Sequence, residues 1–147
     1  MEQTTRYSIQ VARDAALQLH RALFESIRLD YERAHGRIEN PVSLLQLLLE
    51  DSAFAWLRGL SSRLVALDDV LSEPELGVAE GAAARGELEQ ALAEPEFEVH
   101  YLPQLQAAPE VVLAHAQLQD ALAALPPPSS AANRALAALG SNRPIEA

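Results

Sequence analysis

The 147-residue chain contains no cysteine and no lysine. The absence of cysteine excludes disulfides, thiolate nucleophiles and cysteine-ligated zinc. The absence of lysine excludes Schiff-base chemistry and the phosphate-binding lysine of a P-loop. All eleven basic residues are arginine. Together with abundant alanine and leucine, this usage is typical of a protein from a GC-rich bacterial genome.

Long apolar runs are also missing. No stretch of about 18 consecutive apolar residues occurs, so no membrane-spanning helix is expected. The N-terminal segment lacks a basic start followed by an apolar run, so we expect no signal peptide. These features favour a cytoplasmic protein that does not bind membranes. Aromatic residues make up only 5% of the chain, which leaves few large core anchors.

The charge is predominantly negative and unevenly distributed. The net charge is −10 at pH 7. Residues 1–70 hold ten acidic and eight basic residues, a balance of −2, whereas residues 71–125 hold ten acidic residues and one arginine, a balance of −9. Such a surface repels phosphate backbones and anionic lipids. We therefore expect neither nucleic acid nor membranes as partners.

Apolar residues recur at three- and four-residue steps through most of the chain, which predicts amphipathic helices. In the first helix, which Gly36 is expected to end, the predicted stripe is Leu17, His20, Phe24, Ile27, Tyr31 and Ala34. Phe24 and Ile27 are expected to share one core with Phe54, Leu57 and Leu64. No alternation typical of strands is present. The sequence thus predicts an all-α fold, an antiparallel bundle of four to five helices. Residues 1–125 form one domain in this interpretation, and residues 126–147 form a Pro- and Ala-rich C-terminal extension. The helices are expected at about 8–35, 41–50, 53–72, 83–93 and 109–125, with a short helix or turn at 97–102 that ends at Pro103.

The segment 41–50 has a distinctive pattern. Asn40 is a plausible N-cap and Pro41 suits the first helical position. The following sequence VSLLQLLLE is apolar on nearly all sides, which predicts a short buried helix. It would be the natural cover for Trp56, which lies about 160° around its helix from the Leu64 stripe. Trp56 is then a core residue, or an exposed aromatic that binds a partner.

Two histidines stand on apolar helix faces, where a polar ring needs a partner. They are His20 and His115, and a pair of either one with Asp68 is geometrically possible. Arg58 could pair with Asp51 or Asp68. Only one Glu-x-x-His pattern occurs, from Glu32 to His35, whereas a di-iron bundle needs such a pattern on each of two facing helices. No Gly-x-Ser-x-Gly nucleophile elbow occurs. We expect no catalytic residues, no metal and no cofactor.

Residues 19–69 resemble an uncharacterised group of small helical bacterial proteins. The resemblance is carried by the motif D-x-x-F-A-W-L-R-x-L-S, which spans Asp51 to Ser61 in this chain. It implies a helical, cytosolic bacterial protein and does not imply a reaction.

These patterns favour a non-catalytic interaction or self-association module whose partner is a second copy or another protein. A two-fold contact brings the same patch of both copies together, so opposite charges must alternate within it. We expect that contact on the nearly neutral first helix and the Phe54–Asp69 helix. Its residues would include Arg21, Glu25, Arg28 and Glu32, with Leu19 and Leu23 as apolar contacts. The alternative is a small-molecule or cofactor-binding bundle with a pocket near His20, Trp56 and His115.

Overall fold

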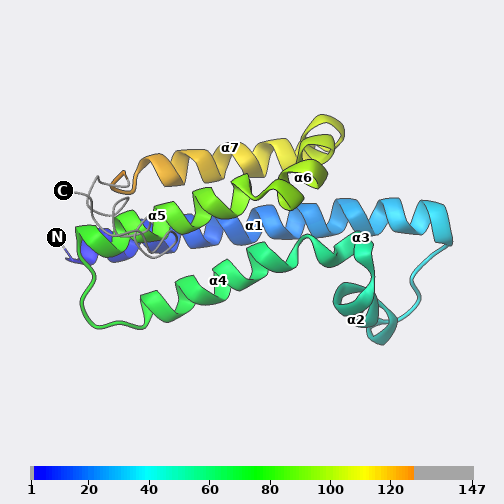
Figure 1. Ribbon diagram of the computed structural model, residues 1–147, viewed down its shortest axis with the longest axis horizontal. Coiled ribbons are helices and arrows are strands. Elements are labelled where there is room, and N and C mark those ends of the chain that lie inside the picture. Colours follow the sequence, from blue (N-terminus) through cyan, green and yellow to red (C-terminus); the bar gives the residue numbers. More distant parts are fainter. Residues whose placement is uncertain (1, 128–147) are drawn as a thin grey trace, which may run out of the picture.

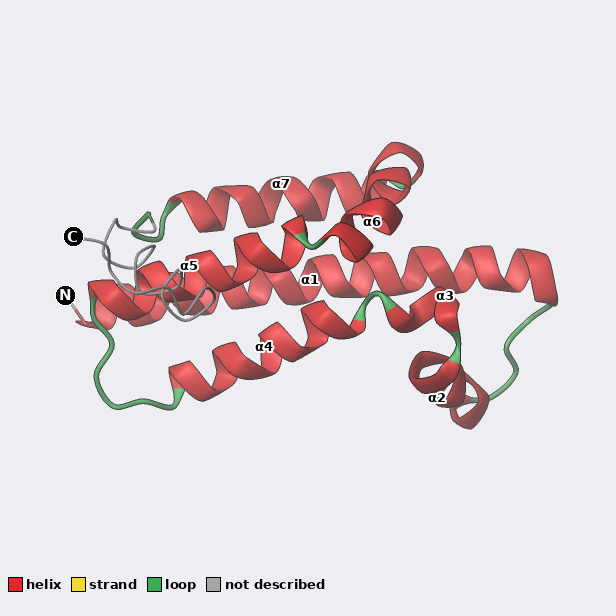
Figure 2. Cartoon of the chain, in the orientation of Figure 1, coloured by secondary structure: helices red, strands yellow, loops and turns green. Residues whose placement is uncertain are grey.

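The computed structural model describes residues 2–127, which form seven helices and no strand (Figure 2). The predicted all-α fold is therefore confirmed for this part of the chain. Residues 128–147, most of the predicted C-terminal extension, lie outside the described residues. The helices are α1 (Glu2–His35), α2 (Pro41–Glu50), α3 (Ser52–Ala55), α4 (Arg58–Leu71), α5 (Val78–Ala93), α6 (Pro95–Ala107) and α7 (Pro109–Ala123).

Four long helices make up the bundle. In Figure 1, α1 and α5 run in one direction while α4 and α7 run in the opposite one, which is the predicted antiparallel arrangement. The central helix is α1, which contacts α4, α5 and α7, most extensively α7. The shorter helices α2, α3 and α6 lie at one end, where the chain passes between long helices (Figure 1).

The core stripe of α1 follows the helical period but is offset from the expected one. Its fully or almost fully buried residues recur every three or four positions: Ile9, Ala12, Ala16, Leu19, Leu23 and Ile27. The expectation that Leu19 and Leu23 are available at a surface is wrong, because both are fully buried. Phe24 and Tyr31, on the expected stripe, are partly buried and pack against the same core. The apolar face is wide because three helices pack around α1.

Several predicted helix boundaries shift. The first helix begins at Glu2 instead of near residue 8, and α5 begins at Val78 instead of near residue 83. The Gly77 backbone N–H donates a 2.7 Å hydrogen bond to the side-chain Oε1 of Glu80 at the start of α5. The predicted stop at Pro103 is wrong, since α6 continues to Ala107. A proline within one turn or so of a helix end removes only one hydrogen bond, and packing on the buried face compensates for it.

The predicted helix 53–72 is interrupted at Trp56 and Leu57, which separate α3 from α4. Both residues at the break are buried, as are Phe54 and Leu60 on either side. Phe54 contacts the rings of Phe24 and Tyr31, with centroids 5.7 and 6.0 Å apart. The predicted common core of Phe54, Leu57, Leu64, Phe24 and Ile27 is confirmed, with Phe24 at its edge.

Candidate functional site

The helix α2 differs from the rest of the fold because none of its residues is buried. It starts as the sequence predicts: Asn40 Oδ1 accepts a hydrogen bond from Ser43 N at 2.8 Å, and Pro41 follows the cap. The predicted burial is wrong. Val42, Leu45 and Leu49 are 66, 55 and 62% exposed.

The two faces of α2 have different surroundings. Leu47 and Leu48 are half-buried and pack against the bundle core. Val42, Leu45 and Leu49, at positions i, i+3 and i+7, share the opposite face. We call these three residues the outer face of α2. An apolar helix needs cover on both sides, and the described residues cover only one.

Polar contacts fix α2 against its neighbours. The Arg58 guanidinium, at the start of α4, donates Nη2 hydrogen bonds to the carbonyl oxygens of Leu48, at 3.4 Å, and Leu49. These carbonyls belong to the last turn of α2, where helix carbonyls lack partners within the helix. Arg58 therefore does not pair with Asp68 as the sequence suggested. It anchors the C-terminal end of α2 to the bundle.

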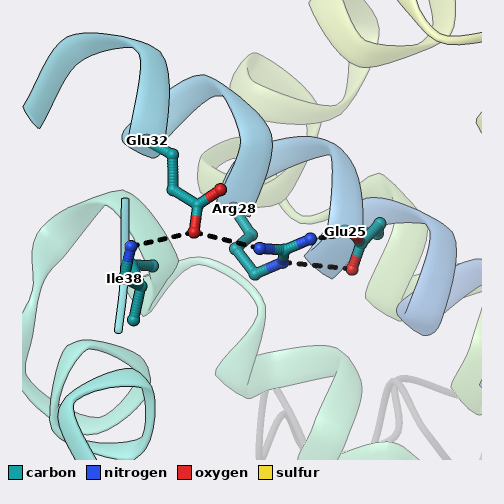
Figure 3. A network of polar contacts seen from close by, with 4 residues as sticks. All are labelled: Glu25, Arg28, Glu32 and Ile38. Carbon is teal, nitrogen blue, oxygen red and sulfur yellow. Dashed lines mark hydrogen bonds and ion pairs between the residues drawn. The ribbon is translucent and has the colours of Figure 1, made fainter. Parts of the chain in front are cut away.

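The linker from α1 to α2 is fixed by a second network, shown in Figure 3. Gly36, at φ 92°, ends α1 as predicted, a backbone conformation that favours glycine. Glu32 Oε2 accepts hydrogen bonds from Ile38 N at 2.9 Å and from Arg28 Nη1 at 3.0 Å. Arg28 also donates to Glu25. This hydrogen bond lowers the pKa of Glu25 and raises that of Arg28.

Three of the four residues predicted for an interface on α1 thus make contacts within their own chain. Glu25, Arg28 and Glu32 form the network in Figure 3. Arg21 is exposed and lines a groove of about 650 Å³ between α1 and the α6–α7 corner. The alternating charges of α1 therefore serve first to hold the α1–α2 linker. Their role in an interface stays a prediction.

A polar cavity of about 640 Å³ lies beside α2. Its walls come from the end of α1, the linker and the side of α2, and include Tyr31, His35, Arg37, Asn40, Ser43 and Glu50. The rings of Tyr31 and His35 stack with centroids 4.3 Å apart. None of the predicted ligand-binding residues lines this cavity.

His20 is placed against Ser61 of α4, not against Asp68. Its Nε2 is 2.8 Å from Ser61 Oγ. Because Ser61 donates its only hydroxyl proton to Leu57 O, 3.2 Å away, Nε2 donates to Ser61. Burial lowers the pKa of His20. A catalytic serine would instead give its proton to the histidine, and an orienting group would hold the other ring nitrogen. The His20–Ser61 pair joins α1 to α4.

His115 and Trp56 belong to one aromatic cluster built around α6. Trp56 packs edge-on against Phe97, with centroids 5.1 Å apart, and stacks on His100 at 5.3 Å. Phe97 contacts Tyr101, whose hydroxyl lies 2.5 Å from His115 Nδ1. Burial raises the pKa of Tyr101. The core interpretation of Trp56 is confirmed, but its cover is α6, and the predicted cover by α2 is wrong.

The five residues predicted to bind a ligand therefore do not converge. Asp68 pairs with Arg13 at 2.9 Å, so its proposed pairing with either histidine is wrong. Trp56 lines a cavity of about 330 Å³ with Phe97 and Arg63. His20 and His115 line neither this cavity nor the two described above.

The sequence alone did not identify Arg63 as a candidate site residue. Its Nε is buried with no hydrogen-bond partner, while Nη1 and Nη2 lie 3.5 Å from carboxylate oxygens of Glu87 and Glu94. No sequence signal distinguishes Arg63 from other arginines on helix faces, because the cavity forms from α4, α5 and α6 together.

Within residues 2–127, no three histidine, aspartate or glutamate side chains gather closely enough to hold a metal ion. None of the described helices is both long and apolar enough to cross a membrane. No protein-family model, curated protein or solved structure matches the chain.

Proposed function

We infer that this protein is a non-catalytic interaction module that binds a protein partner through the outer face of α2. The observation that supports this proposal is the exposure of Val42, Leu45 and Leu49 on one side of a helix whose other side packs on the bundle. Contiguous exposed apolar side chains mark binding surfaces more often than single ones do.

Burying the outer face of α2 against a partner would be energetically favourable. Burying one valine or leucine side chain contributes about 1.5–3 kcal/mol relative to leaving it in water. Three such residues supply a gross gain of several kcal/mol, from which the entropy cost of association is subtracted. The helix is also held in place before binding, by Asn40 at its start and Arg58 at its end. Such preorganisation lowers the ordering cost that a partner must offset.

Site-specific photocrosslinking tests the proposal. A photoreactive phenylalanine analogue replaces Leu45 in the full chain, in cells that naturally express the protein. Val65 provides the matched control, because it is a valine on the exposed side of α4 with 61% exposure. We expect a discrete protein adduct from position 45 and none from position 65. No adduct at 45, or equal adducts at both positions, contradicts the proposal.

A second candidate function, binding of a small ligand, is favoured by the cavity at Trp56. Its apolar wall is formed by Trp56 and Phe97, and Arg63 supplies a cation. Distances of 3.5 Å from Arg63 to its two carboxylates exceed the roughly 2.7–2.9 Å of a charge-assisted hydrogen bond. An aromatic ligand would pack on Trp56 and Phe97, and a carboxylate on that ligand would have to replace Glu87 or Glu94 beside Arg63.

Because Trp56 is the only tryptophan, its emission reports directly on this cavity. Benzoate at millimolar concentration is expected to change the emission of the full chain. The response should weaken in Arg63→Gln, which removes the cation, and persist in Arg85→Gln, which lies outside the cavity. Unchanged emission with benzoate rules out this class of ligand.

A further inference from the structure

We propose that the partner of the outer face of α2 is a second copy of the same chain, in an antiparallel α2–α2 contact. This inference rests on the proposed function and identifies the occupant of that surface. It also moves the predicted self-association from α1 to α2.

The distribution of charge supports a second copy as the partner. Two copies that each carry −10 meet most favourably where the centre of the contact holds no carboxylate, as on the outer face of α2. Among the described helices longer than one turn, α2 alone has a single charged residue, Glu50 at its end. Other exposed apolar side chains, among them Val99 and Leu102 on α6 and Leu113 on α7, lie in the segment with a balance of −9. A copy placed there would set carboxylates against carboxylates.

The orientation follows from Glu50. A parallel pair would place the two Glu50 side chains side by side, and like charges at close range repel. An antiparallel pair places each Glu50 beside the N-terminal end of the other α2, where the helix dipole favours a carboxylate. The same rotation carries Glu50 toward the linker that precedes the other α2, which contains Arg37.

Arg37 adds charge complementarity. Among the described arginines, only Arg21 and Arg37 make no hydrogen bond or ion pair within the chain. Arg37 is exposed and precedes α2 by four residues. In an antiparallel pair, Arg37 and Glu39 near the N-terminal end of one α2 lie beside Glu50 at the C-terminal end of the other, so Arg37 supplies the cation between the two carboxylates. The contact is self-complementary, as a two-fold interface requires.

Sedimentation velocity of the full chain at about 1 to 100 μM tests the oligomeric state. We expect a species of twice the chain mass of 15.9 kDa. Leu45→Glu places two buried carboxylates in the centre of the contact and is expected to weaken the dimer by at least about 100-fold. Val65→Glu adds the same charge at an equally exposed site on α4 and should leave it intact. At concentrations low enough for all three proteins to be monomeric, the unfolding midpoints of both variants should match the wild type, because both positions are exposed in the monomer.

The absence of cysteine allows a direct test of the geometry. In Leu45→Cys, the introduced thiol is the only one in the chain, and residue 45 lies near the middle of α2. A short bismaleimide should therefore join two copies efficiently, whereas Val65→Cys should give little product.

Three results overturn the second-copy proposal. One is a monomer throughout the concentration range, and another is a dimer that Arg21→Glu weakens but Leu45→Glu does not, which would place the contact on α1. The third is a photocrosslink at position 45 to a different protein without any self-adduct. That last result leaves the interaction function standing, so the two proposals fail separately.

Discussion

Leucine side chains are buried to different extents in the four-helix bundle and in the helix α2. In the bundle, Leu19, Leu23, Leu60 and Leu118 are at most 1% exposed, since each faces helices on several sides. In α2, leucines at the same three- and four-residue spacing are half-buried or exposed. The local pattern of both regions is helical and apolar. What differs is the number of neighbouring elements that reach each helix.

This contrast separates elements that stabilise the fold from an element that is only attached to it. The bundle helices bury apolar area against each other. By comparison, α2 is held by its cap at Asn40, by hydrogen bonds from Arg58, and by one packed face. We therefore expect that changes to the outer face of α2 leave the bundle folded. Of the four predictions that follow, the first three test that division and the last concerns the bundle.

Phe54→Ala should have the largest effect. Phe54 is fully buried and packs against Phe24 and Tyr31, so its truncation leaves a cavity and should cost about 3–5 kcal/mol in the free energy of unfolding. Leu49→Ala on the outer face of α2 should change it by less than about 0.5 kcal/mol when the protein is dilute enough to be monomeric. Urea denaturation followed by circular dichroism measures both. Similar losses for the two variants would remove the distinction between the regions.

Asn40→Ala removes the N-cap of α2 and should cost about 1 kcal/mol. The loss should be local, so amide hydrogen exchange should speed up in residues 41–50 and not in α7. Asn40→Asp serves as the control, because aspartate accepts the same hydrogen bond from Ser43 N. Uniform acceleration across the bundle would show that α2 and the bundle open as one unit.

Arg58→Gln tests the attachment at the other end of α2. It removes the hydrogen bonds from the guanidinium to the carbonyls of Leu48 and Leu49, which should cost about 0.5–1.5 kcal/mol. Hydrogen exchange is again the measurement, with faster exchange expected near the C-terminal end of α2. Arg33→Gln is the control, since Arg33 pairs on the surface only with Asp30. If amide hydrogens near the C-terminal end of α2 exchange equally fast in both variants, Arg58 does not anchor α2.

His20→Gln should have the smallest effect and concerns the bundle alone. Burial lowers the pKa of His20 below its ordinary value of 6.5. Above pH 6.5 the ring is neutral in both states, so its contribution to stability is fully present there. As the pH falls below 6.5, the unfolded chain binds a proton more readily, and the free energy of unfolding falls until the folded pKa is passed. The wild type should therefore lose stability relative to His20→Gln between pH 7.5 and 5. Urea denaturation at several pH values measures this difference. If the free energies of unfolding of the two proteins change in parallel with pH, His20 does not cause the loss of stability.

Much of this molecule follows from local sequence. The period of the apolar residues determined the helical class, Asn40 and Pro41 determined where α2 begins, and Gly36 determined where α1 ends. These features depend on contacts within one or two turns, which sequence spacing specifies directly. The separation of charge between residues 1–70 and 71–125 is likewise a property of the sequence.

Only the tertiary structure decided what each side chain faces. His20 meets Ser61, Asp68 meets Arg13, and Trp56 is covered by α6, because the helices place residues together that are far apart in the chain. The same reason explains α2: its sequence specifies an apolar helix, but whether both faces are covered depends on how many helices pack around it. In residues 2–127 only one face of α2 is covered, and we propose that a partner covers the other.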